Sequence, residues 1–297
     1  MSENVLDLAA ILWLTSAQLG THDVPCPICG PARRRPVNQR RRVLRVWHFD
    51  AGFASFHCAR CGERGYARDG STSARLDLAA VERAQAEAAE RERVTSSERL
   101  SLARWLWSKR RPIAGSIAEI YLRDARGYTG LLPATLGFLP ARGDHGPAMI
   151  AAFGVPSEPE PGVLEIADND VCGIHITRLA ADGSGKAGAA TDADITDKIM
   201  IARSTGWPIV LAPPNDLLGL AVAEGIEDAL TAHQATGLGA WAAGSASRLP
   251  ALADKVPNYV ECVTIYAHAD PDGRKGAVEL ARQLAERGVE VFTESLT

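Results

Sequence analysis

The sequence predicts an α/β protein: its C-terminal third forms a parallel sheet, a mixed α+β region precedes it, and a small β module lies at the N-terminus. Three observations predict this arrangement. From Gly219 onward, short apolar runs alternate with helical patterns, as in parallel strands joined by crossover helices. Residues 130–214 contain short strand patterns separated by Gly- and Pro-rich loops. Near the N-terminus, two closely spaced cysteine pairs flank an arginine-rich segment.

Composition and charge are those of a globular chain of about two domains. The 297 residues are 46% apolar, enough for a buried core. The net charge of −4 is unevenly spread: between Cys26 and Asp69, ten arginines and no lysine stand against three acids, which gives +7 there and −11 for the rest of the chain. A basic module joined to an acidic one is typical of a nucleic-acid-binding module attached to a metal-binding domain. The alternative is an arginine-rich loop that is only solvated.

The N-terminal segment is apolar without resembling a membrane span or a signal peptide. No run in the chain approaches the ~18 apolar residues of a span. Residues 5–19 are apolar, but Glu3 precedes them and Asp7 interrupts them, so the basic start of a signal peptide is missing. We expect residues 1–20 to form one amphipathic helix, the protein to be cytoplasmic, and no membrane to be a partner.

Four of the six cysteines form two Cys-x2-Cys pairs, Cys26/Cys29 and Cys58/Cys61, each followed by glycine. Zn²⁺ prefers four tetrahedral thiolates, and such short knuckles let backbone amides approach the sulfurs. The spacing suits a β ribbon over residues 22–70 with a hairpin between the knuckles. Disulfides are the weaker alternative, because cytosolic thiols stay reduced. We therefore predict a structural zinc ion held by these four cysteines.

The segment between the cysteine pairs combines arginines with aromatic residues. Arginine suits phosphate recognition, and exposed aromatic rings stack on unpaired bases. Trp47, Phe49 and Phe56 fall near alternate positions, so we expect at least some of them to pack on one face of the ribbon sheet, and we favour packing as the role of the aromatic side chains. For the arginines we favour phosphate contact. The predicted DNA-binding residues are Arg33, Arg34, Arg35, Arg40, Arg41 and Arg42.

The middle of the chain predicts helices followed by strands. An Ala-, Glu- and Arg-rich stretch predicts a solvated connecting helix, a second helical region spans residues 97–110, and a third spans 116–123. Strand patterns follow at 148–155, 171–179 and 198–202. The chain is expected to divide into an N-terminal helix and ribbon (1–70), a helical linker (71–97), an α+β subdomain (98–215) and a parallel α/β domain (216–297).

The last of these regions shows the most regular pattern. Its order is a strand ending at Ala223, a helix over 227–236, a strand at 240–243, a helix over 246–254, a strand at 260–267, a helix over 275–287 and a strand at 289–292. All of these strands are expected to be parallel.

Acidic residues end two of these apolar runs. Glu224 follows residues 220–223, and Asp270 and Asp272 follow residues 260–267. The ends of parallel strands meet at one edge of a sheet, where α/β folds place their active sites. On an extended segment, Asp270 and Asp272 would face the same way because they are two residues apart. Clustered carboxylates repel each other unless a hard cation lies between them, and Mg²⁺ is bound by one or two carboxylates plus substrate phosphates. The sequence thus predicts a metal-dependent site that acts on phosphates.

The two acidic motifs resemble those of a known domain. Glu-Gly-x-x-Asp-Ala after one strand (224–229), followed by Asp-Pro-Asp after a later strand (270–272), is similar to the Toprim domain of DnaG-type primases, type IA and type II topoisomerases and some nucleases. The second cysteine pair and its surroundings, Phe-His-Cys-Ala-Arg-Cys-Gly-Glu-Arg-Gly (56–65), resemble the zinc ribbon of the primases. The resemblance extends over nearly the whole chain and is greatest to primase-like Toprim proteins of phages and other mobile genetic elements.

The resemblance implies roles for individual residues. Glu224 matches the acidic residue that acts in metal-assisted phosphoryl transfer, and Asp228 matches a second acid that joins the metal cluster. Asp270 and Asp272 match the pair that holds Mg²⁺ or Mn²⁺. Arg178 and Lys198 match basic residues of segments that contact the nucleotide or the template. The alternative for both is a surface charge on a strand without a binding role.

The implied activity is that of a DNA-directed RNA polymerase of primase type, a nucleotidyltransferase that makes short RNA primers from NTPs on a single-stranded DNA template. One alternative is a Toprim nuclease that uses the same acids, and another is a non-catalytic DNA-binding accessory protein of replication. The sequence contains no G-x-x-x-x-G-K-[ST] phosphate loop, so a partner helicase or other replication protein would act in trans.

Overall fold

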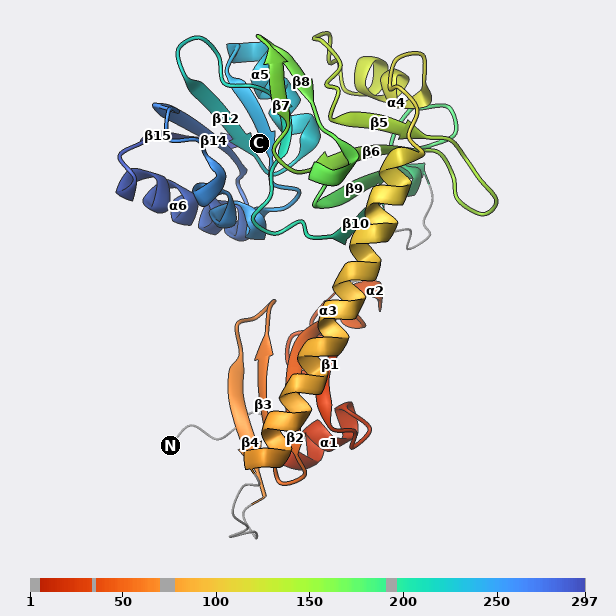
Figure 1. Cartoon of the computed structure of the whole chain (residues 1–297), viewed down its shortest axis with the longest axis vertical. Helices are drawn as coiled ribbons and strands as arrows, with labels where there is room; N and C mark the ends of the chain where they lie inside the picture. The colour runs from red at the N-terminus through yellow and green to blue at the C-terminus, as the bar shows by residue number, and fades with distance from the viewer. Residues whose placement is uncertain (1–5, 34–35, 70–77, 191–196, 297) are drawn as a thin grey trace. The chain divides into compact units, whose positions relative to one another are not determined.

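The computed structural model describes residues 6–33, 36–69, 78–190 and 197–296 (Figure 1). The chain divides into two compact units, Met1–Thr95 and Ser96–Thr297. The finer boundaries predicted from the sequence, at residues 70, 97 and 215, stay predictions. Within the part of the chain that the structure describes, no helix is both long and apolar enough to cross a membrane.

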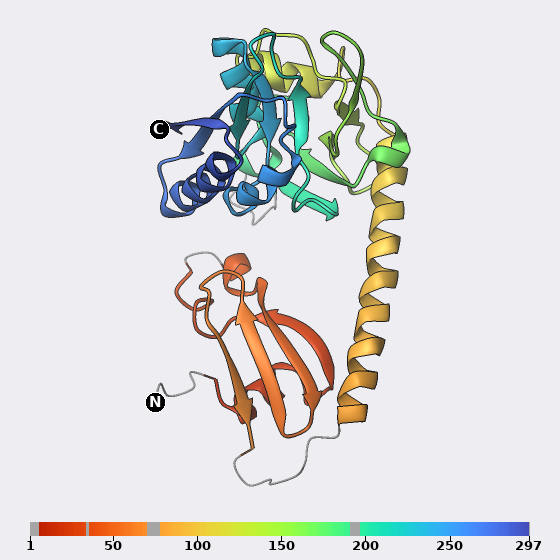
Figure 2. The same ribbon diagram turned by 60° about the vertical axis from the view of Figure 1, so that its left-hand side comes forward.

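The first unit is built on a four-stranded antiparallel sheet in the order β1-β2-β3-β4 (Figure 2). The predicted helix over residues 1–20 is much shorter: α1 ends at Leu14, and the chain enters β1 at Gly20. Positive φ angles at Ser16 and Ala17 mark the turn between them. The elements are α1 (Leu8–Leu14), β1 (Gly20–Pro25), α2 (Pro36–Gln39), β2 (Arg42–Asp50), β3 (Phe53–Cys58) and β4 (Arg64–Arg68).

Strand alternation decides which side chains of this sheet form its core. Leu44, Val46 and Phe56 are buried on one face, where they pack with Ile11 of α1. Trp47 and Phe49 fall on the other face and are only half-buried. The prediction that at least some of the aromatic residues pack on one face is confirmed for Phe56, whereas Trp47 and Phe49 lie on the opposite face.

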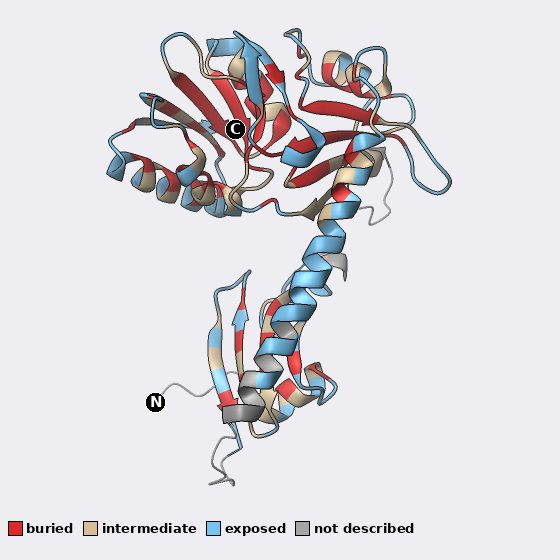
Figure 3. Ribbon diagram, in the orientation of Figure 1, coloured by how far each residue is buried: buried red, intermediate tan, exposed pale blue. Residues whose placement is uncertain are grey.

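A single long helix, α3 (Leu78–Ser108), replaces the two helices predicted over residues 71–110. The polar stretch around Thr95 to Ser97 does not interrupt it, because serine and threonine lower helix propensity only slightly. The helix is exposed along most of its described length, as Figure 3 shows, and it becomes buried only near its C-terminal end, at Ala103 and Trp107.

The N-terminal part of the second unit contains the antiparallel sheet β10-β9-β6-β5. Its central strand β6 is buried along its whole length because both faces are covered. One face packs on Trp107 of α3, and the other packs on Tyr121 and on Leu230 of helix α5 (Ile226–Thr236). The elements are α4 (Ile117–Ile120), the π-helix η1 (Tyr121–Ala125), β5 (Leu136–Leu139), β6 (Ala148–Phe153), β7 (Ser157–Glu160), β8 (Val163–Glu165), η2 (Asp168–Asp170), β9 (Gly173–Arg178), η3 (Ala187–Ala190) and β10 (Lys198–Ala202).

The C-terminal part of the second unit contains the five-stranded sheet β11-β13-β12-β14-β15. Strands β12 to β15 are parallel, as the sequence predicts. Its elements are β11 (Ile209–Ala212), β12 (Gly219–Ala223), α5 (Ile226–Thr236), β13 (Gly239–Ala242), the 3-10 helices η4 (Ala246–Arg248) and η5 (Pro250–Lys255), β14 (Cys262–His268), α6 (Pro271–Glu286) and β15 (Glu290–Leu296).

Two features of this sheet differ from the prediction. Strand β11 was not expected, and it runs antiparallel to β13 at the edge of the sheet. The helix expected over residues 246–254 is instead a pair of 3-10 turns, since Pro250 cannot donate a backbone hydrogen bond to a continuing helix.

Candidate functional site

The acidic residues lie where two adjacent parallel strands end. Strand β12 pairs in parallel with β14, with Ala223 opposite Tyr266. Glu224 comes directly after β12, and Asp270 comes two residues after the end of β14. The carboxyl ends of neighbouring parallel strands therefore bring side chains that are 46 positions apart in the sequence to one edge of the sheet.

Glu224 and Asp270 are each held by one backbone N–H. The N–H of His268 donates to Glu224 Oε1 at 3.2 Å, and the N–H of Gly273 donates to Asp270 Oδ1 at 2.7 Å. A side chain at residue 273 would disrupt this arrangement, because its Cβ would lie 2.7 Å from Glu224 Oε1 and 3.2 Å from Asp270 Oδ1. Glycine at this position thus allows the two carboxylates to flank the start of α6.

Asp228 completes the acidic group from the first turn of α5. Its Oδ2 lies 3.4 Å from Nε2 of His268. Burial raises the pKa of Glu224 above its usual range, and the negative charges of Asp270 and Asp228 raise it further against the effect of His268. The three acids, which are Glu224, Asp228 and Asp270, are therefore close enough to repel one another in the absence of a cation.

Asp272 is not placed as its spacing suggested. Asp270 is the N-cap of α6, and Asp272 lies within the first helical turn and is exposed, so the segment is not extended there. The expectation that both side chains face the same way by strand alternation is wrong, because a helix turns about 100° per residue. Whether Asp272 takes part in metal binding stays a prediction.

The acidic group suits a hydrated divalent cation. Its donors are carboxylate oxygens, which Mg²⁺ and Mn²⁺ prefer. Among the described residues, the cysteine cluster is the one group of three or more candidate ligands close enough to hold an ion directly, so the carboxylates are not gathered as tightly. Mg²⁺ usually keeps several water ligands, and such spacing leaves room for them.

A buried glutamate next to these acids was missed by the sequence analysis. Glu227 accepts a hydrogen bond from the Tyr121 hydroxyl at 2.5 Å and forms an ion pair with Lys186 at 2.8 Å, both through Oε1. Burial opposes ionisation, but the Lys186 charge, the Tyr121 hydroxyl and the charge of Lys198 lower the pKa of Glu227 to about 2. A Cβ at Gly225 would lie 2.7 Å from Asp228 Oδ2 and 3.5 Å from Glu227 Oε2. Glu227 thus joins the acidic group to a set of cationic side chains.

Arg126 extends this network. Its Nε donates to the Tyr121 hydroxyl at 3.0 Å. Burial lowers the pKa of Arg126, but the bond to Tyr121 and the charges of Glu227 and Asp228 outweigh that effect and raise it. Burial and the charge of Glu227 raise the pKa of Tyr121, so its hydroxyl stays protonated and acts as a donor.

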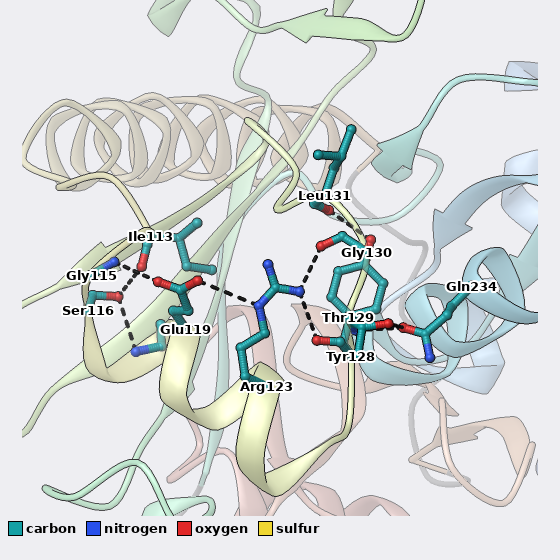
Figure 4. A network of polar contacts seen from close by, with 11 residues as sticks. Ile113, Gly115, Ser116, Glu119, Arg123, Tyr128, Thr129, Gly130, Leu131 and Gln234 are labelled. Carbon is teal, nitrogen blue, oxygen red and sulfur yellow. Dashed lines mark hydrogen bonds and ion pairs between the residues drawn. The ribbon is translucent and has the colours of Figure 1, made fainter.

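A second polar network fixes the segment that carries Tyr121 (Figure 4). Arg123 Nη1 donates to the carbonyl oxygens of Tyr128 at 2.8 Å and Gly130 at 2.7 Å. The backbone N–H of Thr129 donates to Gln234 Oε1 of α5 at 2.6 Å. These contacts tie η1 and the following loop to α5, the helix that also carries Glu227 and Asp228.

The two predicted basic residues lie on opposite faces of their sheet. Lys198 pairs with Thr177 and shares its face with His175, whose neighbour across the sheet is Met200. Arg178 follows Thr177 in the strand and therefore points to the other face, the one that carries Ile174 and Ile176 and packs on α3. The charge of Lys198 acts on Glu227 and His175, whereas Arg178 lies on the opposite face of the sheet.

His175 is buried beside Lys198. Burial and the neighbouring positive charges, first that of Lys198, lower the pKa of His175 to about 4, so its ring is neutral at pH 7. Its Nδ1 lies 3.3 Å from the Thr177 hydroxyl. His175 is thus a neutral core residue at the boundary between the two sheets.

The four cysteines of the two knuckles converge. Cys26 Sγ and Cys61 Sγ are 4.0 Å apart, Cys29 Sγ and Cys58 Sγ are 3.8 Å apart, and all four sulfurs lie within 4.8 Å of one another. A tetrahedral zinc ion with Zn–S bonds of about 2.3 Å would separate its sulfurs by about 3.8 Å. Burial raises the pKa of Cys58, but the backbone amides of Cys61 and Arg60 outweigh this and lower it to about 7. Geometry and donor set fit zinc.

The predicted DNA-binding arginines are exposed where the structure describes them. Arg33 and Arg40 to Arg42 are exposed, whereas Arg34 and Arg35 lie outside the described residues. Arg45, in contrast, is held by Asp23 at 2.8 Å.

Comparison with family models assigns most of the second unit. Residues 219–294 match the Toprim domain, and residues 97–206 match a domain of unknown function, DUF7146. The chain therefore contains a Toprim domain, and the resemblance stated from its acidic motifs is confirmed. The mixed α/β fold with a parallel sheet and an N-terminal cysteine cluster is confirmed as well.

Three solved primase structures are distantly similar to this chain. The zinc-binding and RNA polymerase domains of the Aquifex aeolicus primase show 16% identity and a TM-score of 0.45, over 100% of this chain and 80% of that one. A DNA primase domain from Pseudomonas aeruginosa shows 14% and 0.37, over 66% and 70%. The primase fragment of the bacteriophage T7 primase-helicase protein shows 14% and 0.36, over 91% and 88%. Such values assign no activity to this chain, and no curated protein matches it.

Proposed function

We propose that this chain is a DNA primase, or a primase-like nucleotidyltransferase, that joins ribonucleotides on a single-stranded DNA template. The observation that carries the proposal is the gathering of Glu224, Asp228 and Asp270 at the carboxyl edge of a Toprim sheet, beside Glu227, on which the charge of Lys198 acts. Negative side chains for a metal and a positive one for phosphate are the two requirements of phosphoryl transfer.

The acidic side chains are arranged to hold a cation. Glu224 and Asp270 each have one oxygen anchored by a backbone N–H, and in the described part of the chain the other oxygen has no hydrogen-bond partner. These free oxygens and Asp228 would hold Mg²⁺ or Mn²⁺, which neutralises charge on phosphate oxygens during phosphoryl transfer. Asp272, exposed in the first turn of α6, would add a second-sphere or outer ligand.

The first unit would bind the template. Its exposed arginines suit the DNA backbone, and its half-exposed sheet face carries aromatic rings, with Phe53 stacked on Tyr66 at 6.0 Å between ring centroids. Zinc held by the four cysteines would fix the knuckles that frame this basic segment. A helicase or another replication protein acting in trans would supply unwound DNA.

The test is a priming assay with one charge removed. Asp270→Asn keeps the N-cap hydrogen bond to Gly273, because asparagine caps helices as well as aspartate, and removes only the charge. Labelled NTPs, mixed-sequence single-stranded DNA and Mg²⁺ or Mn²⁺ are incubated with the wild-type protein, with Asp270→Asn and with the control Glu279→Gln, which changes an exposed residue of α6. We expect short RNA from the wild type and the control, and at least roughly a hundredfold less from Asp270→Asn.

The other outcomes reassign the protein. Metal-dependent loss of the DNA without RNA, abolished by Asp270→Asn, would identify a Toprim nuclease. Binding of single-stranded DNA with neither activity would favour a non-catalytic replication accessory protein. RNA synthesis that Asp270→Asn leaves unchanged would refute the assigned metal site.

A further inference from the structure

The loop that follows β13 carries an arginine with no compensating carboxylate among the described residues. Arg248 ends η4, the turn that follows β13, and it is half-buried. Its Nη1 donates to the Ser245 hydroxyl at 2.9 Å, and its Nε is buried without a hydrogen-bond partner. Among the described residues, no carboxylate lies within ion-pair distance of it.

Two other cations near the site have partners. Half-buried Lys186 forms an ion pair with Glu227 at 2.8 Å, and exposed Arg126 donates to the Tyr121 hydroxyl at 3.0 Å. Burial alone acts on Arg248 and lowers its pKa. Withdrawing a guanidinium from water without a counter-charge is unfavourable, so such a group is expected where an anionic ligand compensates it.

Packing places the Arg248 loop between the sheet face that carries Lys198 and helix α6, which Asp270 caps. A Cβ at Gly244 would lie 3.0 Å from the Phe153 ring and 3.1 Å from Met200 Cε, so the start of the loop lies on the sheet face that Met200 shares with Lys198. On its other side, the Ala246 carbonyl oxygen would be 2.4 Å from a Cβ at Gly276 of α6, the helix that Asp270 caps.

Electrostatics agree with this position. The charges of Lys198, Lys186 and Arg248 all act on the buried ring of His175, so the three cations surround one point at the boundary of the sheets. The charge of Glu227 acts on the same ring, and Glu227 is already bound to Lys186 and Tyr121. These three cations and one carboxylate of the described residues give the surroundings of His175 a positive charge.

We propose that Arg248, together with Lys198, binds the triphosphate of the incoming nucleotide beside the acidic group. The inference rests on the proposed function and names a residue of the nucleotide site that the motifs did not indicate. Arginine offers several N–H donors in a planar fork that matches phosphate oxygens. An anion at Nη2, which is not among the buried atoms, would compensate the charge of the guanidinium.

The first measurement is binding of inorganic tripolyphosphate by calorimetry, with the full zinc-loaded chain in buffer free of Mg²⁺ and of chelator. Arg248→Gln is expected to weaken binding roughly ten- to hundredfold, the range for a lost charge-assisted hydrogen bond, and Arg248→Lys is expected to weaken it less. The control Arg282→Gln, on an exposed arginine of α6 paired with Glu279 and Glu286, is expected to bind as the wild type does. Unchanged affinity in Arg248→Gln, or a wild type that does not bind tripolyphosphate, would overturn the proposal.

Thermal unfolding separates a ligand-binding arginine from a structural one. Removing an uncompensated charge is expected to leave the melting temperature of Arg248→Gln at or above that of the wild type. If this variant melts lower and Arg248→Lys binds tripolyphosphate no better than Arg248→Gln does, the arginine is structural and the proposal fails.

A third measurement distinguishes the phosphates of a nucleotide from those of DNA and tests the inference apart from the proposed function. In the priming assay, Arg248→Gln should raise the KM for NTPs, while its affinity for single-stranded DNA by fluorescence anisotropy should stay the same. The reverse pattern would assign Arg248 to the DNA backbone and refute the nucleotide site. Loss of tripolyphosphate binding in a chain that makes no RNA would leave the phosphate site standing and refute the primase.

Discussion

Replacing Glu227 by glutamine tests whether the buried network holds the two sheets of the second unit together. Glutamine keeps the shape and can still accept from Tyr121, so the change removes the charge that pairs with Lys186. A pKa lowered from 4.5 to about 2 corresponds to about 3 kcal/mol at pH 7, at about 1.4 kcal/mol per pH unit. The Glu227 side chain is only 14% exposed, so solvent screening reduces this value little. We expect a loss of about 3 kcal/mol, or roughly 6–12 °C in the melting temperature of a unit of this size.

The pH dependence has a definite sign. Because the folded-state pKa of Glu227 lies below its unfolded value, its contribution is complete above about pH 4.5 and is lost as the pH falls toward about 2. The difference between the wild type and Glu227→Gln should therefore be constant from pH 6 to 8 and shrink below pH 4.5, as measured by urea unfolding followed by circular dichroism.

A matched control separates burial from ion pairing. Glu279 also has a pKa lowered to about 2, by Arg282 and Gln283, but its side chain is 41% exposed. Water screens such a surface pair, so Glu279→Gln should leave the midpoint nearly unchanged. A Lys186→Met/Glu227→Gln double variant should lose less than the sum of its single variants. Equal effects of the two glutamate substitutions, or no effect of Glu227→Gln, would refute the assignment of the network.

Two further predictions concern the candidate metal sites. Glu224→Gln should abolish RNA synthesis yet raise the melting temperature at pH 7, because burial and the charges of Asp270 and Asp228 raise the pKa of Glu224 and make its ionised form unfavourable. This gain in melting temperature should vanish at low pH, where the wild-type carboxyl is protonated. A lower melting temperature of the variant at pH 7 would contradict the prediction. Cys58→Ser should lower the zinc content per chain, measured after a thiol reagent frees the metal, and should destabilise the first unit. Cys262→Ser, which lies outside the cluster, should keep the zinc content of the wild type. Equal zinc content in all three proteins would count against the four-cysteine site.

Local sequence patterns were sufficient for much of the candidate site. The Cys-x2-Cys pairs predicted the sulfur cluster because each knuckle is fixed by residues next to it in the chain. Glu224 and Asp270 were found because an apolar run followed by an acid places that acid at the end of a buried strand, and parallel strands end at one edge. The same apolar runs predicted the bounds of the two strands that precede these acids, β12 and β14, to within a few residues.

Errors arose where a neighbouring residue or a distant contact changed the local conformation. Asp272 was assigned by strand periodicity, but Pro271 begins a helix, for which Asp270 is the cap. Arg178 and Lys198 were grouped as two basic strand residues, and only the register of β9 with β10 shows that they face opposite sides. Strand β11 is a short apolar run whose direction is set by its partner β13.

The sequence by itself determined the Toprim resemblance, the cysteine cluster and the sheet edge at which the acidic residues gather, because these follow from periodicity and short-range spacing. Only the tertiary structure decided which charges are compensated. Tyr121 and Glu227 are 106 residues apart, and their bond depends on how η1 docks on α5. Whether Arg248 has a counter-charge depends in the same way on the packing of a loop against another sheet and another helix. Burial and long-range pairing fix the energy of a charge, and neither is encoded in its neighbours along the chain.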